Sequence, residues 1–106
     1  MPKYLVTADY TSEGMKGVLA KGGTARRDAV EKMATDMGGS LDSFYFAFGD
    51  HDAIVVVDLP DNTTAAAVGM AVSASGMADV TTTVLLTPED VDRAADASVN
   101  YVAPGT

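Results

Sequence analysis

Apolar and polar residues follow two different periods along the chain, and the change from one to the other separates strands from helices. Four short segments are rich in β-branched and aromatic residues, which is typical of strands. They are residues 3–10 (KYLVTADY), 41–48 (LDSFYFAF), 52–60 (DAIVVVDLP) and 80–86 (VTTTVLL). The third of these ends at Pro60, because proline has no N–H to donate to a neighbouring strand.

The segments between the strands have the 3.6-residue period of helices. The first predicted helix begins at Thr11 or Ser12, is interrupted by the glycine pair 22–23, and ends at the glycine pair 38–39, so we expect a broken helix. The second covers residues 63–76, after a capping residue at Asp61 or Asn62. A short third helix begins at TPED, with Thr87 as the cap and Pro88 just inside.

The predicted order β-α-β-β-α-β is typical of the ferredoxin-like α+β fold. In that fold, one four-stranded antiparallel sheet carries both helices on one face, and the first and third strands are central. We expect residues 1–87 to form this domain, and residues 88–106 to form a short C-terminal helix and a tail.

The third strand is apolar on both sides. Ala53, Val55, Val57 and Leu59 share one face, whereas Ile54 and Val56 lie on the other. Two helices can cover only one face of the sheet, and each large apolar side chain left in water forfeits about 1.5–3 kcal/mol. An apolar patch of this kind usually marks an interface. We therefore expect the open face to pack against another subunit, in a dimer or a larger ring; the alternative is that the C-terminal segment folds back over it.

Charge and composition narrow the range of partners. The formal net charge is −8, and Arg26-Arg27 is the only basic pair, so we expect no nucleic-acid partner. The chain has no cysteine, which excludes disulfides, thiolate metal ligands and cysteine nucleophiles. The apolar run before Asp9 is too short for a signal peptide, and no segment reaches the about 18 apolar residues of a membrane span. These features predict a cytoplasmic protein with no membrane partner.

The polar stretch GDHD, residues 49–52, joins the second and third predicted strands. Gly49 and Asp50 predict a two-residue hairpin turn in which Gly49 has a positive φ. This register pairs Phe48 with His51, so His51 would share the face of the phenylalanines and Asp52 would lie on the opposite face, near Tyr45. Adjacent strand side chains point to opposite faces, so these residues do not predict a metal site.

Four residues are candidates for ligand binding: Tyr45, His51, Asp52 and Arg26. His51 is suited to carrying a proton or ligating haem, or it is a turn residue stacked on Phe48. Asp52 either bonds the amides of the turn or, together with Tyr45, lies at the rim of a pocket between sheet and helix. Arg26, like Lys3 and Lys16, is either an anion-binding residue or a solvated surface residue or ion-pair partner. The sequence contains no phosphate loop and no histidine at an identifiable offset from a serine nucleophile.

The sequence resembles a family of small bacterial proteins, the GYD domain proteins. The resemblance covers most of residues 2–87 and rests on PKYLVTADYTSEGMKG, on Arg26 before a helix ending in GG, on FYFAFGDHDAIVVVDLPD and on the threonine-rich fourth strand. It implies a ferredoxin-like fold similar to the dimeric α+β barrel proteins, and it brings no agreed activity. His51 stands where the family usually has tyrosine. The positions that the resemblance singles out are Tyr4, Gly14, Arg26, Tyr45, Gly49 and Asp52.

These observations together predict an oligomeric module that binds a small ligand or assembles with itself, without catalytic machinery of its own. We expect no cofactor in such a module. The alternative is a cofactor-light monooxygenase or a haem-handling enzyme of the dimeric α+β barrel type, which would use His51 beside the aromatic-lined sheet.

Overall fold

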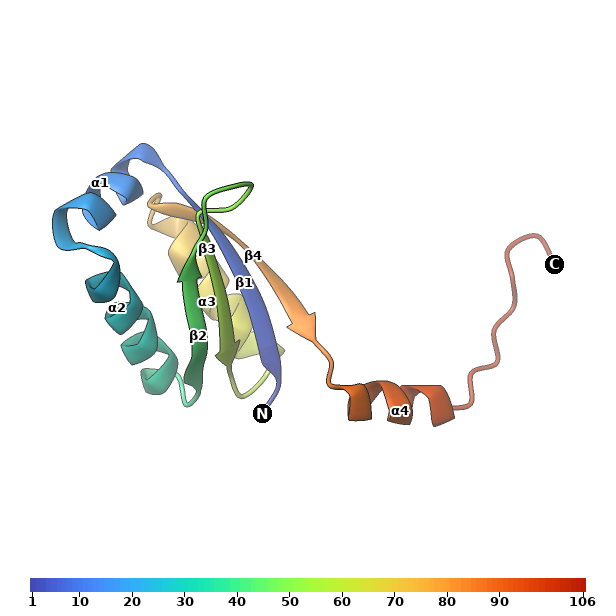
Figure 1. The fold of residues 1–106 in the computed structure, drawn as a ribbon. Coiled ribbons are helices and arrows are strands. Elements are labelled where there is room, and N and C mark those ends of the chain that lie inside the picture. The colour runs from blue at the N-terminus through green and yellow to red at the C-terminus, as the bar shows by residue number, and fades with distance from the viewer.

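Four strands form one antiparallel sheet in the computed structural model, which describes residues 1–106 (Figure 1). The elements follow in the order β1 (Lys3–Tyr10), α1 (Ser12–Lys21), α2 (Gly23–Asp36), β2 (Ser40–Phe46), β3 (Ala53–Asp58), α3 (Asn62–Ala74), β4 (Ala78–Leu85) and α4 (Pro88–Asp96). Along the sheet, the strands lie in the order β2-β3-β1-β4, so β1 and β3 are central, as predicted. This α+β arrangement is compatible with the ferredoxin-like fold.

The helices begin where the sequence predicts their caps. The side chain of Thr11 accepts a hydrogen bond from the Gly14 N–H at the start of α1, and Asp61 accepts one from the Thr64 N–H at the start of α3. The bond from Thr64 holds the pKa of the Asp61 carboxyl below its ordinary value. The predicted broken helix is confirmed as α1 and α2, which meet at Gly22 with a φ of 89°.

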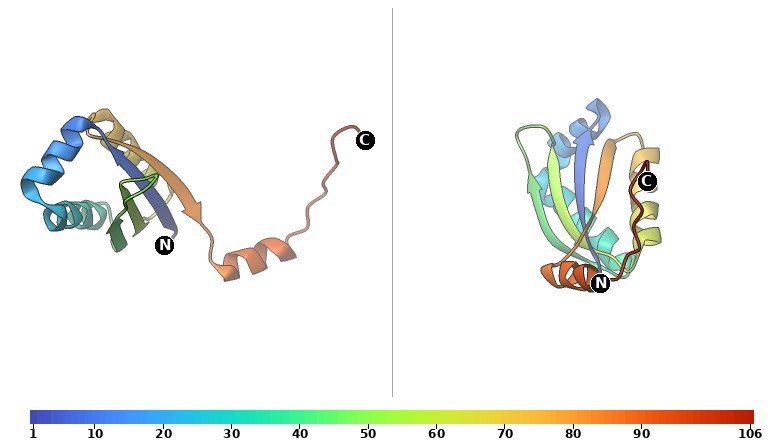
Figure 2. Two further views of the ribbon diagram at one scale, coloured as in Figure 1. Left: turned by 45° about the horizontal axis from the view of Figure 1, so that its top comes forward. Right: turned by 90° about the vertical axis from the view of Figure 1, so that its right-hand side faces the viewer.

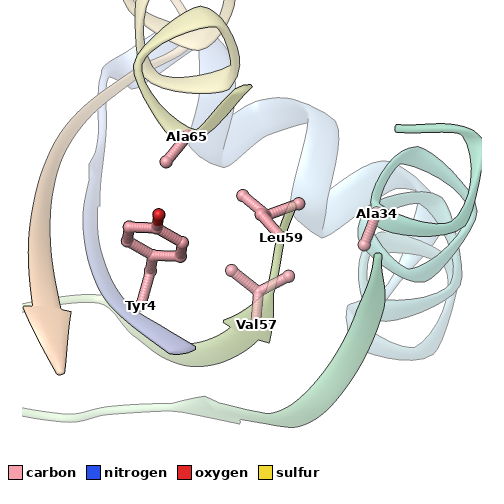
Figure 3. Close-up of a cluster of buried hydrophobic side chains, with 5 residues drawn as sticks. All are labelled: Tyr4, Ala34, Val57, Leu59 and Ala65. Atoms are coloured by element: carbon pink, nitrogen blue, oxygen red, sulfur yellow. The ribbon is translucent and has the colours of Figure 1, made fainter. Parts of the chain in front are cut away.

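The core lies between the sheet and helices α2 and α3. Its main cluster contains Tyr4, Ala34, Val57, Leu59 and Ala65 (Figure 3). Tyr4 is the largest fully buried side chain, and its hydroxyl donates a 2.7 Å hydrogen bond to Asn62 Oδ1 at the start of α3. Five of the ten buried residues are alanines, so the side chains on this face are too small to fill the space beneath the helices.

No helix covers the other face of the sheet, which we call the open face. The strand register places Leu5 and Thr7 of β1 there, beside Ile54 and Val56 of β3. Tyr45, opposite Ile54 in β2, is 69% exposed. The central apolar residues of this face are therefore uncovered within one chain.

The C-terminal segment does not fold back over the open face. Helix α4 has no buried residue, and it makes no extensive contact with another helix or strand. Figures 1 and 2 show α4 and the tail extending away from the sheet. The alternative in which this segment covers the open face is therefore not the arrangement of this chain. No helix of the protein combines the length and the apolarity that crossing a bilayer requires.

The connection between β2 and β3 differs from the two-residue turn that the sequence predicts. The register of Phe46 with Ala53 and of Tyr45 with Ile54 is confirmed. The last hydrogen bond runs from the Ala47 N–H to the Asp52 carbonyl at 2.8 Å, so the loop beyond it is residues 48–51. Gly49 does not have the predicted positive φ, because a longer loop reverses the chain without a left-handed residue at that position.

Gly14 lets α1 lie directly against the connection between α3 and β4. A Cβ atom at Gly14 would lie 1.8 Å from the carbonyl oxygen of Met77, which is backbone and cannot rotate away. We predict that Gly14→Ala lowers the free energy of unfolding by about 1–3 kcal/mol, the range for overpacking a tight site. Urea denaturation measures this change.

Gly17→Ala is the matched control on the same helix. A Cβ at Gly17 meets nothing within 4 Å, so this substitution should raise the free energy of unfolding by about 0.5–1 kcal/mol through helix propensity alone. Equal effects of the two substitutions would contradict the close approach of α1 to Met77.

Candidate functional site

An apolar cavity of about 60 Å³ lies between the sheet and helices α2 and α3. Its walls include Val55 and Val80 of the sheet, Phe44 of β2 and Val68 of α3. The alanines of the core leave this space, because their side chains are short on both the sheet and the helices that face it. A space with such walls favours apolar atoms over water.

A larger cleft, of about 580 Å³, opens beside this cavity between α1, α2 and the C-terminal end of α3. The cleft and the cavity share wall residues from the sheet, α2 and α3. The shared residues are Tyr10, Arg26, Met33, Val72 and Ala78. The volume of the cleft falls within the range of about 300–1,000 Å³ that is usual for small-molecule sites.

Arg26 lies at the boundary between the apolar cavity and the cleft. It belongs to the first turn of α2, and its side chain is partly buried. Its Nε atom is buried and has no hydrogen-bond partner in the chain. A buried donor without a partner costs about 1–3 kcal/mol, so Arg26 gains from any acceptor that enters the cleft.

The basic side chains divide into those that pair with a carboxylate and those that face the cleft. Five of the seven lysines and arginines lie within 4.0 Å of a carboxylate: Lys3, Lys16, Arg27, Lys32 and Arg93. The other two, Lys21 and Arg26, have no carboxylate partner, and both line the cleft. Glu13 also lines it, but its carboxylate is paired with Lys16 at 3.3 Å.

This arrangement combines apolar walls with two unpaired positive charges. Apolar walls exclude water and bind the hydrocarbon part of a ligand, and guanidinium and ammonium groups bind carboxylate, sulfonate or phosphate oxygens. The cleft is therefore chemically suited to a small molecule that has an apolar body and an anionic group.

His51 lies outside this site. Its Nδ1 atom is 3.3 Å from Asp9 Oδ2, and Asp9 follows Leu5 and Thr7 on the open face by strand alternation. The prediction that His51 shares the face of the phenylalanines is wrong, because Phe44 and Phe46 face the helices and the longer loop carries His51 to the other side. His51 lines neither the cavity nor the cleft.

Asp52 anchors the hairpin to the central strand. Its carboxylate accepts a 2.8 Å hydrogen bond from the Tyr10 N–H, and its own N–H donates to the Ala8 carbonyl at 2.9 Å. These bonds favour the structural interpretation of Asp52. Tyr45 is exposed on the open face, so the structure does not bring Tyr45 and Asp52 together at the rim of the cleft.

The open face carries one group of paired charges at each end of its central strands. The Lys3 ammonium donates to both carboxylate oxygens of Asp58, at 3.1 and 3.0 Å, and Asp42 lies 3.8 Å away. The bonds to Asp58 are the main reason that the pKa of Lys3 is raised. At the other end, Asp9 is paired with His51. The apolar centre of the face lies between these two groups.

Of the four residues that the sequence singles out for ligand binding, only Arg26 lines the cleft. Sequence reasoning missed Lys21 and Tyr10. Lys21 immediately precedes the glycine break at residues 22–23, and Arg26 follows it, so two basic residues flanking a helix break were the available signal. Tyr10 follows the ordinary alternation of side chains along β1, and no sequence motif marks it as a ligand-binding residue.

Comparison with known proteins gives the family of the chain. No curated protein and no solved structure matches it significantly. The sequence model of the GYD domain matches residues 4–95, which include all of the sheet except Lys3, the residues that line the cleft and most of α4. The chain therefore belongs to the GYD domain family.

Proposed function

We propose that this protein is a binding module for a small molecule with an apolar body and an anionic group, without catalytic machinery of its own. The observation that carries the proposal is that Lys21 and Arg26, the two basic side chains without a carboxylate partner, both line the cleft. The expected setting is the cytoplasm, as the sequence suggests.

The physical basis is the environment of the two cations. A hydrogen bond to a charged group contributes about 1.5–3 kcal/mol, more than a neutral one. Arg26 presents its buried Nε beside apolar walls that lower the local dielectric constant, which strengthens its attraction to an anion. The hydrocarbon part of the ligand would lie against Met33 and Val72, which belong to both the cleft and the cavity.

Self-assembly through the open face is a second proposed function, supported by the uncovered residues at its centre. Ile54 of the central strand β3 is 39% exposed, and Tyr45 beside it is 69% exposed. No segment of the same chain covers them. We propose that the open face of a second copy does so, in a homo-oligomer.

The structure does not contain the arrangement of His51 that motivated the enzyme alternative. A haem-handling or monooxygenase role depended on His51 lying beside the aromatic residues of the sheet. His51 is instead paired with Asp9 on the open side, apart from the cleft.

An anionic, apolar fluorescent probe tests the binding site. 8-Anilinonaphthalene-1-sulfonate has both features, and we predict that it binds the wild-type cleft with enhanced fluorescence. Arg26→Met should weaken its affinity by about tenfold or more, because one charge-assisted hydrogen bond is lost. Fluorescence titration at constant ionic strength measures the dissociation constant.

Arg27→Met is the matched control, because Arg27 is the adjacent arginine, is exposed, and is paired with Asp28. It removes the same charge without changing the cleft. An equal loss of affinity in both variants would contradict binding at Arg26 and would indicate a general effect of charge on the probe.

Sedimentation velocity tests assembly through the open face. We predict that Ile54→Lys weakens self-association by about a hundredfold or more, because it places an unpaired charge at the centre of a desolvated interface. Ala67→Lys, on the exposed surface of α3, should leave association unchanged. If Ile54→Lys also associates as the wild type does, assembly does not use the open face.

A further inference from the structure

The chain ends in an arm that has no partner within its own subunit. The arm consists of Leu86, Thr87, α4 and the tail to Thr106, and nearly every residue in it is exposed. The radius of gyration of the chain is 16.8 Å, whereas a compact domain of this length has about 13 Å. The longest dimension reaches 57 Å, because the arm extends beyond the sheet (Figures 1 and 2).

The arm nevertheless contains a regular helix with a defined N-terminal cap. Thr87 and Asp90 form a capping box at the start of α4, with Pro88 in the first turn, and Arg93 is paired with Asp90. A helix of nine residues is marginal in water even with good caps. Its stability has to come from packing of an apolar face, and its own chain does not provide that packing.

One side of the arm is apolar. Val91, Ala94 and Ala95 stand at i, i+3 and i+4 of α4, so they share a face, while Asp92 and Asp96 lie on other faces. Val91 is 52% exposed, and the tail adds exposed apolar residues. These are Val99, Tyr101 and Val102.

The arm and the open face lie on the same side of the molecule. In Figures 1 and 2, α1 and α2 lie on one side of the sheet, and α4 with the tail projects on the other. A second copy whose open face met the first would therefore lie alongside the arm.

The area of the open face gives an independent reason to include the arm. Four strands spaced about 4.8 Å apart, each about 25 Å long, cover roughly 500 Å². A stable interface buries about 800 Å² of accessible surface on each partner. Side chains give a face more accessible surface than its flat footprint, so a face of this size comes close to that area only when nearly all of it is buried. The exposed apolar residues of the arm would add to the buried area.

We propose that two copies of this chain exchange arms: the open faces meet about a two-fold axis, and the apolar side of each arm packs on the other subunit. The proposal rests on the assembly proposed above and adds the segment that closes it. Two-fold symmetry makes the contact reciprocal, so each arm finds one site and the assembly stops at two copies.

The first test compares two single substitutions that introduce the same residue into full-length protein. Val91→Gln changes the apolar face of α4, and Asp92→Gln changes its neighbour on another face; glutamine is a good helix former in both positions. In sedimentation velocity, we expect Val91→Gln to raise the dimer dissociation constant at least tenfold, and Asp92→Gln to change it less than threefold. The triple variant Val91→Gln, Val99→Gln, Tyr101→Gln should raise it further.

The second test asks whether the arm contacts its own subunit or the other one. The chain has no cysteine, so Asp96→Cys accepts a single spin label. Labelled chains are mixed with unlabelled chains carrying ¹⁵N, and only the latter are observed. We expect broadening of amide signals in the ¹⁵N chains, which can arise only across the interface.

The outcomes separate this inference from the assembly on which it rests. A wild-type dimer whose dissociation constant is unaffected by the triple variant would overturn arm exchange and leave the assembly standing, as would a dimer without broadening in the ¹⁵N chains. A wild-type monomer would overturn both. An oligomer larger than two would overturn the two-fold arrangement.

Discussion

The burial of β3 is the constraint on which the rest of this structure depends. Its side chains are apolar on both faces, yet the helices of the chain cover only the face that carries Val55 and Val57. The covered face becomes the core, with Tyr4 fixed by its hydrogen bond to Asn62. The other face stays uncovered within one chain, and the arm beyond β4 does not return to it. Both the proposed assembly and the proposed arm exchange follow from this imbalance.

The small side chains of the core explain the candidate site. Alanines at positions such as Ala53 and Ala65 let backbone elements approach each other but do not fill the space beneath the helices. The glycine break at Gly22 then turns α1 away from α2 and sets Lys21 and Arg26 around one cleft. A chain with a formal charge of −8 leaves only these two basic side chains unpaired, so the cleft differs in charge from the surrounding surface.

Local sequence signals predicted the fold well, because caps, glycine breaks and strand alternation act over a few residues. Asp61 capped α3, and Ile54 and Val55 took opposite faces, as expected. The prediction of the hairpin was wrong at Gly49 and His51. The length of a loop depends on hydrogen bonds to other parts of the fold, which are here the bonds between Asp52 and β1. Lys21 could not be predicted as a site residue, since its role depends on which carboxylates the fold brings near it.

The mass of the wild-type protein in solution tests the central claim most directly, since it shows whether a second copy is present to cover the open face. Native mass spectrometry of the purified protein reports this mass together with any retained small molecule. The account predicts a particle of two chains, each of 10.9 kDa. A particle of one chain at micromolar concentration, with the open face in water, would contradict it.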